Sequence, residues 1–164
     1  MTWRFLSLAV LNEDKDLPEQ FRAYMTWSRG MHRVLVAAEE RYGQDAVDRL
    51  YTAVGRRVHD RGEERDDAVI AAALADAGLP ADLAAARDDA GLDKVVRASH
   101  DEAQARVGTE SGSPVVAIGD GPAFFGPVIH PIPEGEEADR LFEAFRLLST
   151  VPQFSELKRA RLPF

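Results

Sequence analysis

The order of helix and strand signals constrains the fold of this chain more than any other feature. Residues 20–107 carry apolar side chains three and four positions apart, which is the spacing of amphipathic helices. Strand signals occur only outside this block: segment 3–11, WRFLSLAVL, is apolar on both alternating faces, as an inner strand would be, and a second group covers 114–125. An isolated strand and a hairpin make a compact sheet only if they pair. The sequence therefore predicts an α/β fold, a mixed sheet with residues 20–107 as a helical insertion.

Glycines mark where helices of the block should end. Gly43, Gly78 and Gly108 each follow an apolar stripe, and glycine is common just past a helix C-terminus. Helices are expected at 21–42, 47–58, 68–77, 80–86 and 92–107. After the block we expect a hairpin of strands 114–118 and 123–125, joined by a Gly-Asp-Gly-Pro turn, and then helices at 138–148 and 153–161.

The composition bounds the class of protein. The chain has 164 residues, which suits one domain spanning 1–164, and its net charge of −8 argues against a nucleic-acid surface. It has neither an apolar run of about 18 residues, the length of a membrane span, nor the features of a signal peptide, so a cytoplasmic location is expected. The absence of cysteine excludes disulfides, thiolate–metal sites and cysteine nucleophiles within these residues.

The polar residues that could hold a metal have better structural explanations. The four histidines lack metal-ligand spacing, so we expect surface or packing roles, with His100 partly buried. The acidic runs at 63–67 and 134–139 coincide with expected helix starts, where negative charge complements the helix dipole. No metal site is predicted.

The stretch Gly112-Ser113-Pro114 places a proline at the start of strand 114–118. Proline has no N–H to donate to a sheet, so it suits the first residue of a strand, an edge or a bulge. Most X–Pro bonds in folded proteins are trans, and the local sequence by itself predicts an ordinary strand start.

Three longer stretches carry a resemblance to a known family: WRFLSLAVLNEDKDLPE, SGSPVVAIGDGPAFFGPVIHPIPEGEEADRLFEAF and PQFSELKRAR. They resemble the mycothiol-dependent nitroreductase group in the DsbA-like branch of the thioredoxin fold, and the resemblance spans 3–161. It implies a thioredoxin-like, DsbA-type mixed sheet that lacks its first βα unit. It also implies a thiol-disulfide oxidoreductase that reduces disulfides or nitro-compounds. Mycothiol, a low-molecular-weight thiol, would be the co-substrate, and no bound cofactor is expected.

The resemblance assigns roles to particular residues. Pro114 matches a cis-proline that abuts the redox dithiol, and Ser113 matches the residue whose backbone groups meet the bound thiol or mixed disulfide. Asn12, at the end of strand 3–11, is a further substrate-binding candidate. The helical insertion would form a lid over the groove that binds the thiol or substrate. Trp27 and Met31 could belong to this lid or, equally, to the hydrophobic core.

The same resemblance implies that the family's first strand, its Cys-Pro-Trp-Cys type dithiol and its first helix are missing from this chain. We therefore expect the chain as given to be inactive and its coding sequence to continue upstream of Met1. The alternatives are a short product, either a non-catalytic binding relative or a decaying gene, and a relative of the kappa-type glutathione transferases, which use a thiol without a dithiol. The strand edge left exposed by the missing segment could also support a homodimer.

Overall fold

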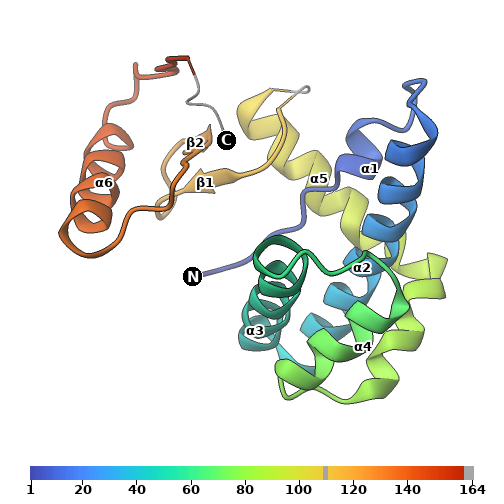
Figure 1. Cartoon of the computed structure of the whole chain (residues 1–164). Helices are drawn as coiled ribbons and strands as arrows, with labels where there is room; N and C mark the ends of the chain where they lie inside the picture. The colour runs from blue at the N-terminus through green and yellow to red at the C-terminus, as the bar shows by residue number, and fades with distance from the viewer. Residues whose placement is uncertain (109–110, 161–164) are drawn as a thin grey trace. The chain divides into compact units, whose positions relative to one another are not determined.

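The computed structural model describes residues 1–108 and 111–160, which form two compact units (Figure 1). Unit 1 runs from Met1 to Asp101 and is helical. Unit 2 begins at Glu102 and holds a two-stranded hairpin and one further helix. Helix α5 (Asp93–Val107) belongs to both units. The described structure is mixed α/β and mostly helical, which agrees with the predicted class at this coarse level.

Unit 1 is built mainly from the helices that the apolar spacing predicts. Its elements are α1 (Leu8–Leu11), α2 (Glu19–Tyr42), α3 (Gln44–Gly55), the π-helical turn η1 (Arg56–Asp60), α4 (Asp67–Asp76), and the 3₁₀ segments η2 (Ala81–Asp88) and η3 (Ala90–Leu92). Gly43 and Gly78 follow α2 and α4 with φ of 77° and 65°, a region that favours glycine. The predicted positions of α2, α3, α4 and η2 are confirmed to within a few residues, whereas α1 and η3 were not predicted.

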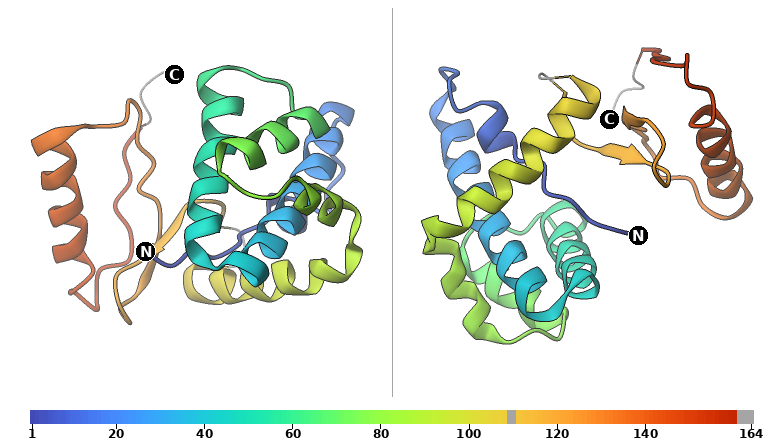
Figure 2. Two further views of the ribbon diagram at one scale, coloured as in Figure 1. Left: turned by 90° about the horizontal axis from the view of Figure 1, so that it is seen from below. Right: turned by 180° about the vertical axis from the view of Figure 1, so that it is seen from behind.

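The core of unit 1 lies where α2 packs against α3 and η2, and where α4 packs against α3 and η2 (Figure 2). Its most completely buried apolar side chains come from all four of these elements: Val34, Val36, Val47, Leu50, Ile70, Leu74 and Leu83. Burying such side chains is the main favourable contribution to folding, at about 25 cal/mol per Å² of apolar surface. Met31 belongs to this core and Trp27 packs against it, so both have the plain packing role.

The strand predicted at 3–11 is wrong. Residues 3–7 have no regular structure and residues 8–11 form α1. The side-chain amide of Gln44 takes the place of a neighbouring strand: it accepts from the Trp3 N–H at 2.5 Å and donates to the Trp3 carbonyl at 3.3 Å. The Phe5 N–H donates to the Ser99 hydroxyl at 2.8 Å. An extended segment between helices needs the same apolar pattern as an inner strand, so the pattern did not separate the two.

Unit 2 contains the predicted hairpin. Strands β1 (Val115–Ala117) and β2 (Ala123–Phe125) are antiparallel, with Val116 opposite Phe124. Helix α6 (Gly135–Leu148) follows and starts ten residues after β2 ends, with Glu136 and Glu137 in its first turn. Within 1–108 and 111–160 the hairpin is the whole sheet, so the predicted pairing with 3–11 is wrong.

The helix predicted at 153–161 is also wrong over its described part. Residues 154–160 have no regular structure, and residue 161 lies outside the described residues. Phe154 is half-buried and packs on Phe124 with ring centroids 5.6 Å apart, but Leu157 is 84% exposed. A short segment with one anchored apolar residue has no apolar stripe to bury, and helices of this length are unstable without one.

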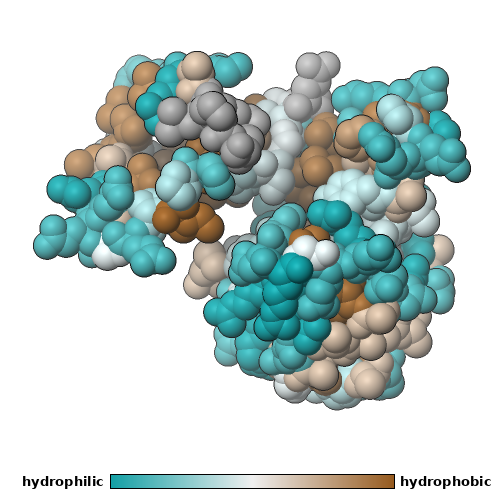
Figure 3. Space-filling model, viewed as in Figure 1, coloured by the Kyte–Doolittle hydropathy of each residue, from teal (hydrophilic) through white to brown (hydrophobic). Residues whose placement is uncertain are grey.

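Helix α6 exposes apolar side chains. None of its residues is buried, and Phe142 and Leu147 are 62% and 53% exposed. In Figure 3 brown, apolar residues lie on the surface of the part of the chain that carries α6. No helix in the described part of the chain combines the length and the apolar character needed to cross a membrane.

Candidate functional site

Ser113 and Pro114 lie immediately before β1, in unit 2, and both are exposed. The Ser113–Pro114 peptide bond is cis, as are Gly126–Pro127 and His130–Pro131. The Pro114 carbonyl accepts a 2.8 Å hydrogen bond from the Gly126 N–H, which continues the hairpin ladder by one step beyond the Val115–Phe125 pair. Pro114 is therefore fixed by the hairpin through its carbonyl, while its ring and the Ser113 side chain remain accessible.

The last turns of α5 hold both ends of this hairpin. Gln104 Nε2 donates to the Ser111 carbonyl at 2.6 Å, and Ser111 Oγ donates to the Val107 carbonyl at 3.2 Å. At the turn between the strands, Arg106 Nη2 donates to the Gly121 carbonyl at 2.8 Å. The segment that carries Ser113 and Pro114 is thus attached to α5 at Ser111, and the turn of the hairpin is attached separately at Gly121.

The two phenylalanines of β2 face opposite sides, as alternation along a strand requires. Phe124 is buried and contacts Phe145 edge-on, with ring centroids 5.9 Å apart, as well as Phe154. Phe125 is 46% exposed. Phe124 is a core residue of unit 2, and Phe125 leaves an aromatic face available beside the hairpin.

Asn12 lies in unit 1. It was expected to end a strand, but it is the residue that ends helix α1. Its side-chain Nδ2 donates to the Leu8 carbonyl at 2.8 Å, and its backbone N–H donates to the same carbonyl at 3.2 Å. The amide donor that a substrate would need is therefore engaged in capping α1. Ser113 and Pro114 belong to unit 2. Each unit therefore contains only some of the three residues predicted to bind substrate.

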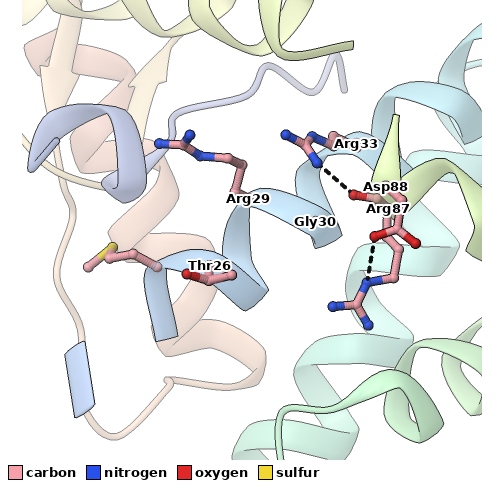
Figure 4. A pocket seen from close by; sticks show the side chains of 7 residues that line it. Thr26, Arg29, Gly30, Arg33, Arg87 and Asp88 are labelled. Atoms are coloured by element: carbon pink, nitrogen blue, oxygen red, sulfur yellow. Dashed lines mark hydrogen bonds and ion pairs between the residues drawn. The ribbon is translucent and has the colours of Figure 1, made fainter. Parts of the chain in front are cut away.

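A pocket of about 330 Å³ lies between α2 and η2 in unit 1, lined by Met25, Thr26, Arg29, Gly30, Arg33, Arg87 and Asp88 (Figure 4). The sequence interpretation missed it. Arg29 and Arg33 are four residues apart, so their shared face of α2 could have been inferred. The approach of Arg87 could not, since it depends on how η2 returns to α2.

The charges around this pocket largely offset one another. Arg33 makes a bidentate ion pair with Asp93, with Nε–Oδ1 and Nη2–Oδ2 distances of 2.7 and 2.8 Å, and donates Nη1 to the Arg87 carbonyl at 2.8 Å. The hydrogen bond from Arg33 lowers the pKa of the Asp93 carboxyl below its ordinary value. Arg87 is paired with Asp67 and Asp88. Most of the cationic groups here join elements of unit 1 to one another.

His32 and His100 have the environments of packing residues, whereas His59 and His130 are exposed. His100 is 4% exposed, and burial lowers its pKa. His32 Nδ1 lies 2.8 Å from the Ser28 carbonyl, its ring packs edge-on to Phe5, and burial lowers its pKa as well. The described residues contain no group of three histidine or acidic side chains arranged to hold a metal ion.

Comparison with known proteins shows the family to which the chain belongs. Residues 1–159 match the family model described as Rv2466c-like, mycothiol-dependent nitroreductase Rv2466c. The chain is also similar to the uncharacterized protein Rv2286c of Mycobacterium tuberculosis (strain ATCC 25618 / H37Rv), with 33% identity over 167 residues. That alignment covers 99% of this chain and 70% of the relative. The chain belongs to the Rv2466c-like family of mycothiol-dependent nitroreductases.

Proposed function

We propose that this chain takes part in mycothiol-dependent reduction and that the segment Ser113–Pro114 binds the thiol. The observation that carries the proposal is the family match, which extends over residues 1–159 and so includes both units. The exposure of Ser113 and Pro114 beside a fixed hairpin supports this choice of segment. The substrate would be a nitro-compound or a disulfide, in keeping with the family.

The proposal includes the fold. A thioredoxin-like, DsbA-type arrangement would make residues 1–164 one domain, with 20–107 as its helical insertion and Asn12 near the thiol site. The hairpin and the helical block that follow from the sequence are consistent with such an arrangement. A cytoplasmic location and a homodimer remain predictions, and size-exclusion chromatography with light scattering would test the second.

The cysteine count limits which step these residues perform. Reducing a nitro group to a nitroso group with two thiols forms one disulfide and one water, so two sulfur atoms must supply the two electrons. Residues 1–164 contain no cysteine and cannot form a mixed disulfide with the thiol. Their proposed part is to bind and orient mycothiol, and we expect binding without turnover by this chain.

Calorimetric titration with mycothiol, beside a nitro-reduction assay, tests the proposal. The 164-residue chain should bind mycothiol saturably and should not reduce a nitro-compound above the rate of mycothiol alone. Absence of binding would overturn the thiol site, and enzyme-dependent turnover would overturn the restriction to binding.

A matched pair of variants locates the site. Ser113→Lys places a long cationic side chain beside Pro114 and should weaken mycothiol binding by about tenfold, on the scale of one lost set of contacts. Ser155→Lys makes the same change at another exposed serine of unit 2 and should leave binding unchanged. Equal effects of the two variants would place the thiol elsewhere.

A further inference from the structure

Gln104 is a buried amide in a region of α5 where an apolar residue would be expected. It is 7% exposed, and its Nε2 donates to the Ser111 carbonyl at 2.6 Å, a short bond. Ser111 stands two residues before Ser113. A buried amide is costly unless its polar atoms are hydrogen-bonded, so its presence calls for a reason.

Only half of this amide is satisfied. Gln104 Oε1 is buried and has no hydrogen-bond donor among residues 1–108 and 111–160. A methionine or leucine of similar volume would remove this unpaired acceptor from the buried position. Stability therefore gives little reason for glutamine here, and the bond to Ser111 is what the amide contributes.

That bond belongs to a set that fixes the chain on either side of Ser113. Ser111 also donates its hydroxyl to the Val107 carbonyl at 3.2 Å and its N–H to the Gly108 carbonyl at 3.3 Å. Beyond Ser113, the Pro114 carbonyl is held by the Gly126 N–H at 2.8 Å. Ser113 thus lies between two anchored residues, Ser111 and Pro114. Of the bonds that anchor them, the one from Gln104 is made by a long side chain of α5.

We propose that Gln104 is a positioning residue for the thiol site: it holds Ser111 so that the backbone of Ser113 is presented in one orientation. This inference rests on the proposed function of Ser113–Pro114. It differs from a structural role in one measurable respect. Loss of the amide should weaken ligand binding without weakening the fold, because removing the unpaired buried oxygen offsets the lost bond to Ser111.

Gln104→Met tests this separation. Mycothiol affinity should fall about fivefold, the effect of one ordinary hydrogen bond, while the Tm stays equal or rises. Arg106→Met is the matched control, since Arg106 also donates to a hairpin carbonyl but at the Gly121 end, and it should leave affinity unchanged. Unchanged affinity in Gln104→Met, or a loss of affinity accompanied by a fall in Tm, would overturn the inference.

Amide NMR keeps the inference separate from the proposed function. In Gln104→Met the amide signals of Ser111 and Ser113 should shift, and hydrogen exchange at the Gly126 N–H should accelerate, whether or not mycothiol binds. If the wild-type chain binds no mycothiol, the proposed function fails, and these signals alone decide whether Gln104 positions the segment. Ser111→Ala, at a half-buried position, removes only the hydroxyl bond to Val107 and should shift the same signals less; no shift in either variant would overturn the inference.

Discussion

Replacing Arg33 by methionine should destabilise unit 1, because this one side chain joins α2 to both α5 and η2. Its guanidinium makes two hydrogen bonds to Asp93 and one to the Arg87 carbonyl, and it is 15% exposed. Hydrogen bonds to charged groups contribute roughly 1.5–3 kcal/mol when they are buried. The Asp93 carboxylate is 38% exposed, so water replaces part of the loss, and we expect a total of about 2–3 kcal/mol.

The magnitude can be measured by urea unfolding followed by far-ultraviolet circular dichroism. For a chain of this length, about 2–3 kcal/mol corresponds to a fall in Tm of roughly 4–12 °C. A double-mutant cycle with Asp93→Asn isolates the ion pair and should give a coupling energy of about 1–2 kcal/mol. Arg41→Met, on the same helix, breaks the exposed pair with Asp82 and should have little effect.

The pKa of Asp93 provides an independent measurement. Arg33 lowers the pKa of Asp93 below its ordinary value, so the stability gained from the pair is present above pH 3.8 and is lost as the pH falls below that value. In Arg33→Met, carbon-detected NMR titration should find that the pKa of Asp93 has risen. A coupling energy indistinguishable from zero, or an unchanged pKa of Asp93, would refute the reasoning.

Two further predictions concern a buried titratable group and the hairpin. Burial lowers the pKa values of His100 and His32 below 6.5, so as the pH falls the unfolded chain takes up protons before the folded chain does, and the stability should fall below pH 6.5. His100→Leu should reduce the difference between the urea midpoints measured at pH 7.5 and 5.5, and an unchanged difference would contradict this. Phe124→Ala should cost about 3–4 kcal/mol, because the ring is 9% exposed and packs on two other aromatic rings, whereas Phe125→Ala should cost under about 1 kcal/mol; equal losses in thermal unfolding would be against the assignment of core and surface.

The helices could be predicted from the sequence because each depends on local information. The apolar spacing of α2 fixes which face is buried, and Gly43 supplies the positive φ with which the helix ends. The hairpin follows from two short strand-forming runs and the turn residues between them. The relation of Arg33 to Arg87 and Asp93 is of another kind, since those residues are separated by more than fifty positions and meet only when η2 and α5 pack on α2.

One segment that the sequence misplaced, residues 3–7, is held by a helix side chain where a neighbouring strand was expected, and the residue four positions before β1 is held in a similar way. Gln44 pairs with both backbone groups of Trp3, and Gln104 binds the carbonyl of Ser111. A single glutamine amide offers the donor and acceptor that a neighbouring strand would offer, but it leaves no periodic pattern in the sequence. Strand-like composition therefore predicts extended backbone, and the identity of its hydrogen-bond partner depends on which helix lies beside it. The same reasoning makes Gln104 the residue to test first, because its amide holds Ser111, two residues before Ser113.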